Sequence, residues 1–250
     1  MNYSLEIAFN GAAFHGFQRQ KSSYSVQEEV ESALSKLIKE PIVVTGCGRT
    51  DTGVHALSFF LNFKCTVDLH DLNFLYKINQ VLSKDVACLA VWEVPEKFNA
   101  RFAAIDRTYV YQVNMIKNPF LQQQSLFLKT APNFELMNEA AVYLIGNQNF
   151  ECFSKVHTEV ANFMCTISQA EWSEEGAKAH FTITANRFLR NMVRAIVGTL
   201  LEIGYEKQKP KDILKIIESR DRSQAGKSVA ANGLFLKSIR YHQEDWNRIY

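Results

Sequence analysis

The chain reads Gly46-Cys47-Gly48-Arg49-Thr50-Asp51-Thr52-Gly53-Val54-His55-Ala56 over the polar loop that we expect to organise its fold. Three glycines fall within eight residues of this loop, and glycine adopts backbone angles that other residues resist. Apolar runs at residues 42–45 and 57–65 flank the loop and predict two strands. We therefore expect a rigidly held connection between two strands that presents Arg49, Asp51 and His55.

Outward from this loop, the first 95 residues or so read strand, helix, strand, strand, helix, strand. Residues 25–28, Ser-Val-Gln-Glu, fit a capping box, and apolar residues then recur at helical spacing until Pro41. The spacing of Leu72, Leu75, Ile78 and Leu82 predicts a second helix, and strands are expected at residues 6–9 and 86–94. This order is the split β-α-β-β-α-β arrangement of ferredoxin-like domains.

The rest of the chain repeats that order without any repeat at the residue level. Strands are predicted at residues 108–115, 164–172, 178–186 and 234–241, and helices at 136–145, 188–204 and 213–218. We therefore predict an α+β fold of two ferredoxin-like halves with antiparallel sheets, residues 1–104 and 105–250, which meet near residues 96–106.

Composition indicates an ordinary globular protein, since 47% of the residues are hydrophobic and no run approaches the length of a membrane span. The start of the chain does not resemble a signal peptide, so we expect a cytoplasmic protein without membrane contact. Its five cysteines lack any CxxC pair, which favours reduced and buried thiols.

Charge is unevenly distributed along the chain. Residues 178–227 carry 11 Lys and Arg against 5 Asp and Glu, an excess of +6, so the remainder sums to −4 within a net charge of +2. Such a segment suits a polyanion such as RNA, although a solvated helix surface would also explain it.

Two further segments carry candidate site residues. Strand alternation places Arg107 and Tyr109 on one face, where they can hold a flat anionic or aromatic ligand; the same pattern also fits ordinary strand aromatics. In the predicted helix 188–204, Arg187, Arg190 and Arg194 are expected along one side. Arg194 has apolar neighbours, and an enclosed arginine needs an anionic partner, for which Asp51 is a candidate.

Most templates for catalysis fit poorly. The sequence has no Gly-x-Ser-x-Gly elbow, no Walker lysine, no zinc-ligand spacing and no acidic cluster typical of a magnesium site. If the polar loop is catalytic, a single aspartate, Asp51, must act alone.

These residues resemble the tRNA pseudouridine synthase A family over nearly the whole chain. The signature is Gly48-Arg49-Thr50-Asp51-Thr52-Gly53-Val54-His55-Ala56, and supporting motifs occur at residues 14–20, 98–102, 107–111, 188–194, 196–200 and 233–236. The resemblance implies isomerisation of uridine to pseudouridine at positions 38, 39 and 40 of the tRNA anticodon stem-loop. It also implies a homodimer that needs no cofactor or metal, with the sheets of its two halves joined around a basic cleft.

Matching motif positions assign roles to individual residues. Asp51 would be the catalytic aspartate, Tyr109 the aromatic against the target uracil, and Arg194 the partner of Asp51. RNA contacts would come from Gln18, Arg19, Arg49, Arg101, Arg107 and Arg190, while His55 is left as a structural or RNA-contacting residue.

Two alternatives from other classes stay open. A non-catalytic RNA-binding protein or tRNA-folding chaperone would use the same basic groove, but binding alone does not need an aspartate facing a polyanion. A phosphate-transfer enzyme that uses Asp51 would depend on a metal ion.

Overall fold

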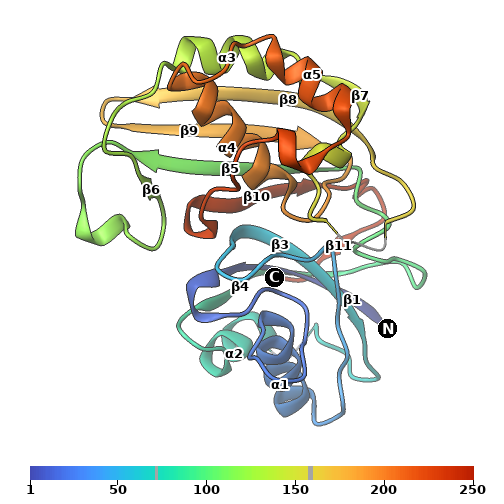
Figure 1. Ribbon diagram of the computed structural model, residues 1–250. Coiled ribbons are helices and arrows are strands. Elements are labelled where there is room, and N and C mark those ends of the chain that lie inside the picture. The colour runs from blue at the N-terminus through green and yellow to red at the C-terminus, as the bar shows by residue number, and fades with distance from the viewer. Residues whose placement is uncertain (71–72, 157–159) are drawn as a thin grey trace. The chain divides into compact units, whose positions relative to one another are not determined.

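The computed structural model describes residues 1–70, 73–156 and 160–250, which form a mixed α+β fold (Figure 1). The described residues contain five α-helices and eleven strands, so the predicted α+β class is confirmed. The chain divides into two compact units, residues 1–105 with 236–250, and residues 106–235. This division differs from the predicted one at the end of the chain, because residues 236–250 group with the first unit.

The first unit is built on an antiparallel sheet in the order β11-β4-β1-β3, with the short strand β2 beside β3. Figure 1 shows α1 and α2 on one side of this sheet. The elements are β1 (Asn2–Phe9), α1 (Val26–Ile38), β2 (Thr45–Gly46), β3 (His55–Lys64), α2 (Phe74–Val81), β4 (Val86–Glu93) and β11 (Asn247–Arg248), while β10 (Leu234–Arg240) extends into this unit from the second.

Helix α1 begins and ends as the sequence predicts. The Ser25 hydroxyl accepts a hydrogen bond from the Glu28 amide at 3.2 Å, as in the first half of a capping box. The helix ends where Lys39 takes a left-handed conformation with φ of 63°, two residues before Pro41. Val30 and Leu34 on its inner face are fully buried, which ties the helix to the core.

The predicted strand at residues 42–45 is wrong except at its last residue. The amide of Ile42 donates to Ser35 Oγ at 2.9 Å and that of Val44 donates to Glu31 Oε1 at 3.1 Å. These two donors are used by side chains of α1, so pairing with β3 begins only at Thr45. The predicted second helix begins at Phe74, and Leu72 lies outside the described residues.

The second unit carries an antiparallel sheet in the order β5-β9-β8-β7, with β6 in parallel beside β5. Trp172 on β8 packs between Phe134 and Phe181, with ring centroids 5.5 and 5.3 Å away, and so links helix α3 to the sheet. The elements are β5 (Asp106–Asn114), β6 (Leu126–Phe127), α3 (Phe134–Val142), β7 (Gly146–Asn149), β8 (Met164–Glu175), β9 (Lys178–Ala185), α4 (Met192–Gly204) and α5 (Asp212–Ser219).

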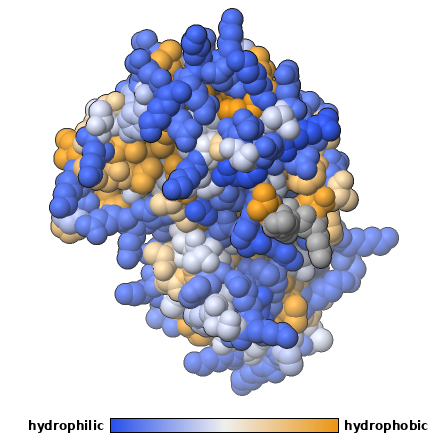
Figure 2. Space-filling view, in the orientation of Figure 1, coloured by the Kyte–Doolittle hydropathy of each residue, from blue (hydrophilic) through white to orange (hydrophobic). Residues whose placement is uncertain are grey.

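Short 3-10 turns complete the described chain at Gly11–Ala13, Pro119–Leu121, Glu151–Phe153, Arg222–Gln224 and Ala231–Gly233. None of the described helices is long and apolar enough to cross a membrane. The surface seen in Figure 2 is mostly hydrophilic, with hydrophobic residues in separate patches. All five cysteines are free and buried, as predicted, and burial raises the pKa of Cys88 to about 12.

Replacing the helix cap tests the account of α1. Ser25→Ala should lower the free energy of unfolding by about 1 kcal/mol, because the Glu28 amide loses its acceptor. The measurement is urea unfolding of the whole chain. Ser32→Ala is the matched control, since Ser32 is exposed in the middle of the same helix and should change stability by less than about 0.5 kcal/mol. Equal effects of the two substitutions would contradict the role of the cap.

Candidate active site

The loop from Gly46 to Ala56 is braced by direct contact with the backbone of the first loop, residues 10–20. A methyl group placed on Gly11 would lie 2.0 Å from the carbonyl oxygen of Val54. One placed on Gly16, where φ is 83°, would lie 2.3 Å from the carbonyl oxygen of Thr50. Side chains at either glycine would therefore push the two loops apart.

His55 reinforces the same contact from inside the protein. Its side chain is 2% exposed, and its Nδ1 accepts a hydrogen bond from the Gly11 amide at 3.1 Å. Because Nδ1 accepts, it carries no proton in this arrangement. His55 is therefore a buried structural residue and not one that contacts RNA from the surface.

The start of the loop is held by an aromatic pair. The Phe17 and Phe59 rings stack with centroids 4.2 Å apart, and a methyl group on Gly46 would lie 2.3 Å from the Phe17 ring. The Cys47 amide donates to the Phe60 carbonyl at 2.8 Å, which continues the pairing of β2 with β3.

Asp51 lies at a tight turn within this braced loop. The Val54 amide donates to the Asp51 carbonyl at 3.1 Å, and Gly53 has a φ of 80°, which favours glycine. The Asp51 side chain is half-buried, whereas Arg49 is exposed. The loop thus fixes the backbone that carries the Asp51 carboxylate, while it leaves Arg49 exposed to solvent.

Gln18 and Arg19 are fixed by two polar residues of α1 that the sequence analysis did not single out. Gln27 Oε1 accepts from Gln18 Nε2 at 2.8 Å and from the Arg19 amide at 2.9 Å. The Arg19 guanidinium lies 3.3 Å from the buried carboxylate of Glu31. Polar residues four apart on the inner face of an amphipathic helix are the signal that could have identified this pair.

In the second unit, β5 carries Tyr109 and Arg107. Tyr109 is half-buried, and its ring meets Phe188 edge-on with centroids 5.1 Å apart and an interplanar angle of 87°. Arg107 donates from Nη1 to the Asn186 carbonyl at 2.8 Å. The Tyr109 ring therefore has a fixed orientation, with Phe188 against it.

The predicted helical alignment of Arg187, Arg190 and Arg194 is wrong. Helix α4 begins only at Met192, after Asn191 in a left-handed conformation with φ of 66°. Arg187 and Arg190 therefore precede the helix, and Arg194 alone of the three lies within it. Arg190 is exposed, while Arg187 and Arg194 are half-buried.

Arg194 is held by residues 221–230, which we call the strap. Its Nε donates to the Val229 carbonyl at 2.8 Å, and the Val229 amide donates to the Arg194 carbonyl at 3.1 Å. With Nε engaged, the orientation of the guanidinium plane is fixed. Neither Val229 nor its neighbours has a sequence signal that could have shown this role, because the contact is made by backbone atoms.

The strap packs closely against α4 because small residues line the contact between them. A methyl group on Gly198 would lie 1.9 Å from the Lys227 carbonyl oxygen. The buried Thr199 hydroxyl accepts from the Gly226 amide at 2.8 Å and donates to the Ala195 carbonyl at 2.9 Å. The hydroxyl of Tyr111 donates a hydrogen bond to the Ala230 carbonyl at 2.8 Å. Burial raises the pKa of Tyr111, and the nearby charge of Arg194 lowers that pKa by a smaller amount.

The predicted site residues thus occur in two sets. The first unit holds Asp51 with Gln18, Arg19, Arg49 and Arg101, and the second holds Tyr109 and Arg194 with Arg107 and Arg190. Hydrogen bonds within the first unit hold Gln18 and Arg19, and hydrogen bonds within the second unit hold Arg107 and Arg194. Among the described residues, no cluster of three or more His, Cys, Asp or Glu side chains could hold a metal ion.

Comparison with known proteins identifies the class. A sequence profile described as tRNA pseudouridine synthase matches residues 140–242, which include α4 and its strap. This profile, together with relatives that match over almost the full length, places the chain among the pseudouridine synthases, which are isomerases of uridine in RNA. A solved structure of a Cbf5-Nop10-Gar1 complex matches 80% of this chain and 45% of the chain compared, at 12% sequence identity and a TM-score of 0.35.

Curated relatives extend this match to almost the full length. The tRNA pseudouridine synthase A of Parabacteroides distasonis is 42% identical over 97% of this chain and 96% of its own. The enzyme of Bacteroides fragilis is 41% identical over 97% of this chain and 97% of its own. The enzyme of Francisella philomiragia is 36% identical over 99% of this chain and 96% of its own. The chain belongs to the tRNA pseudouridine synthase A family, as its motifs predict.

Two glycines near the site give a matched test of the brace. Gly11→Ala should lower the free energy of unfolding by roughly 1–3 kcal/mol, because its new methyl group would collide with the Val54 carbonyl. Gly48→Ala should change stability by less than about 0.5 kcal/mol, since nothing lies within 4 Å of the added carbon. Thermal unfolding of both variants provides the comparison, and a fully stable Gly11→Ala protein would refute the brace.

Proposed function

We propose that this protein isomerises uridine to pseudouridine in tRNA, at positions 38, 39 and 40 of the anticodon stem-loop, with Asp51 as the essential carboxylate. The observation that carries the proposal is the braced loop: Asp51 is its only acidic residue, and its backbone is fixed by Gly11, Gly16 and His55. The names of the relatives supply tRNA as the substrate. The positions within tRNA rest on the resemblance of the motifs.

The reaction moves one bond and one proton. The bond from ribose C1′ to uracil N1 breaks, the base turns, and a bond forms from C1′ to C5. C5 then loses its proton and N1 gains one, so the product is an isomer and no co-reactant is consumed. Because the atoms involved are enclosed within a stacked stem-loop, the enzyme must first extrude the nucleotide.

Tyr109 is proposed to receive the extruded uracil. A base that leaves its stack loses stacking contacts, and stacking on an aromatic side chain can restore roughly 1–3 kcal/mol. Tyr109 is suited to this because it is half-buried and its ring orientation is fixed by Phe188. Its hydroxyl is also a candidate for handling the proton at C5.

Arg194 is proposed to pair with Asp51. An arginine beside the carboxylate would hold its position and balance its charge, whether Asp51 attacks C1′, adds to the uracil ring or removes a ribose proton. The engagement of Nε by Val229 supports this role, because the remaining edge of the guanidinium then faces one way and can bind a carboxylate through two parallel hydrogen bonds.

The remaining assignments concern the RNA and the assembly. We propose Gln18, Arg19, Arg49, Arg101, Arg107 and Arg190 as contacts to the tRNA, and a homodimer as the working form. We further infer that each unit is a ferredoxin-like half and that their sheets border a basic cleft; the order β4-β1-β3-β2 in the first unit supports the first part of this inference. Residues 1–104 would carry the catalytic aspartate and residues 105–250 Tyr109 and Arg194.

Removing the charge of Asp51 tests the central assignment. Asp51→Asn keeps the shape of the side chain, so tRNA binding should stay while pseudouridine formation falls by at least about 10²-fold. The assay maps pseudouridine in the anticodon arm of tRNA from a strain that lacks the enzyme. If the Asp51→Asn variant formed pseudouridine at the wild-type rate, Asp51 would have no catalytic role. Binding by the wild-type protein without any pseudouridine would favour the non-catalytic RNA-binding alternative.

Changing Arg194 tests its proposed pairing. Arg194→Lys should lower kcat by about tenfold or more with tRNA affinity largely kept, because an ammonium group cannot reproduce the planar fork or the bond from Nε to Val229. Single-turnover rates and equilibrium binding separate the two effects. Unchanged turnover would remove Arg194 from the site, whereas equal losses of binding and turnover would make it an RNA contact.

A further inference from the structure

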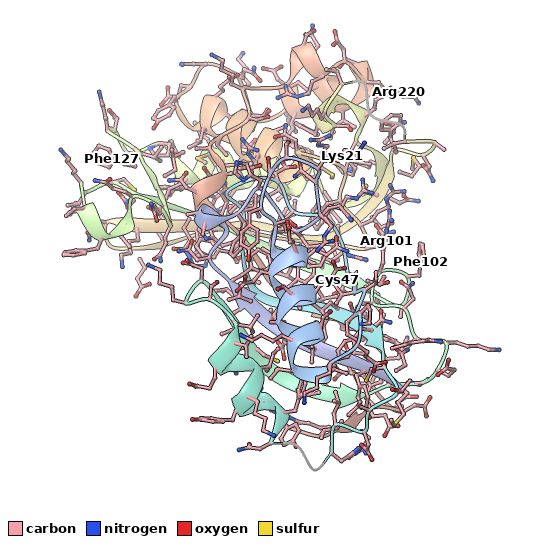
Figure 3. All side chains as sticks on the ribbon, turned by 90° about the horizontal axis from the view of Figure 1, so that it is seen from below. Lys21, Cys47, Arg101, Phe102, Phe127 and Arg220 are labelled. Carbon is pink, nitrogen blue, oxygen red and sulfur yellow. The ribbon has the colours of Figure 1, made fainter. Side chains whose placement is uncertain are left out.

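The connection between β4 and β5 carries an aromatic side chain that is almost fully exposed. Phe102 is 79% exposed, and Arg101 beside it is exposed as well. The guanidinium carbon of Arg101 lies 5.5 Å from the centroid of the Phe102 ring, within the range of a cation–π contact. Figure 3 labels the two side chains, which lie next to each other.

A compact turn holds these two residues. The side-chain oxygen of Asn99 accepts from the amides of Arg101 at 3.0 Å and Phe102 at 3.2 Å. The backbone carbonyl of Asn99 accepts a hydrogen bond from the Ala103 amide at 3.0 Å. Asparagine commonly organises turns in this way, and the result is a fixed backbone at both residues.

The base of the turn is anchored in the core of the first unit. Ala100 is fully buried; its amide donates to Asn62 Oδ1 at 2.9 Å, and its carbonyl accepts from the Tyr241 hydroxyl at 2.7 Å. Asn2 and Asn62 also donate to the Phe98 carbonyl, at 3.2 and 3.3 Å. The exposed ring therefore projects from a rigid support and not from a mobile loop.

Single exposed apolar residues are ordinary, and Phe120 is an example at 89% exposed. Phe102 differs because an arginine lies over its ring. Arg248 lies over the ring of Trp92 in the same way, but that ring is half-buried. A rigid aromatic ring with an adjacent guanidinium matches a nucleotide, which offers a flat base and a phosphate.

We propose that Arg101 and Phe102 form a stacking platform for an unpaired nucleobase of the RNA substrate, separate from the target uridine that Tyr109 receives. The base stacks on the Phe102 ring, and Arg101 lies within reach of the backbone phosphate of the same strand. This inference rests on the proposed function, since it takes the RNA substrate from there. It adds a second aromatic contact, in the first unit, to that proposal.

The test is equilibrium binding of a tRNA anticodon arm to Phe102 variants, made in the Asp51→Asn background so that no turnover occurs. Phe102→Ala should weaken binding by about tenfold, as expected for one lost base stack. Phe102→Tyr should bind within about twofold of the parent, because its ring has the same face. Phe102→Leu should behave like Phe102→Ala, since it keeps the apolar surface but has no ring.

Phe120→Ala is the matched control, because Phe120 is at least as exposed as Phe102 and no arginine of the described residues lies over its ring; it should leave binding unchanged. Unchanged affinity of Phe102→Ala would overturn the platform, as would Phe102→Leu binding like the parent. A change in the sedimentation of the RNA-free Phe102→Ala protein would overturn it too, because the ring would then be a protein contact. Pseudouridine formation by the wild-type protein is measured separately, so failure of the proposed function would be seen independently of failure of the platform.

Discussion

The position of Asp51 depends on the close approach of two stretches of backbone. Gly11 and Gly16 face the carbonyls of Val54 and Thr50 at distances that leave no room for a side chain. One carbonyl lies on each side of Asp51, so the turn that carries it is fixed at both ends. A carboxylate presented in this way needs no rearrangement of its own backbone when the substrate arrives, which is how enzymes obtain electrostatic preorganisation.

The same device holds Arg194 in the other unit. There Gly198 faces the Lys227 carbonyl, as Gly11 faces that of Val54. In each brace a buried side chain accepts a hydrogen bond from a glycine amide. His55 Nδ1 accepts from the Gly11 amide, and Thr199 Oγ1 accepts from the Gly226 amide. A buried amide without an acceptor would be costly, so each acceptor keeps its brace closed. The two groups proposed to form one catalytic pair are thus each fixed locally before they act.

Sequence reasoning succeeded where structure is determined locally. The capping box at Ser25 and the glycine-rich loop around Asp51 are short-range patterns, and both are found where they were predicted. It failed where distant side chains compete for backbone donors, as Glu31 does for the amide of Val44. It also placed the start of α4 too early, because buried Leu189 continues the apolar spacing of the helix although Asn191 breaks it. Backbone contacts such as Arg194 to Val229 leave no pattern in the sequence at all.

The arginines assigned to RNA differ in how much of their charge is available to it. Arg19 faces the buried carboxylate of Glu31, and Arg107 donates to a backbone carbonyl. A buried carboxylate needs such a partner, so the charge of Arg19 is largely balanced within the protein. Arg19 is nevertheless exposed, as are Arg49, Arg101 and Arg190. An arginine that already balances a buried carboxylate releases fewer counterions when it binds a phosphate, so Arg19 should contribute less to the salt dependence of RNA binding than its exposure suggests.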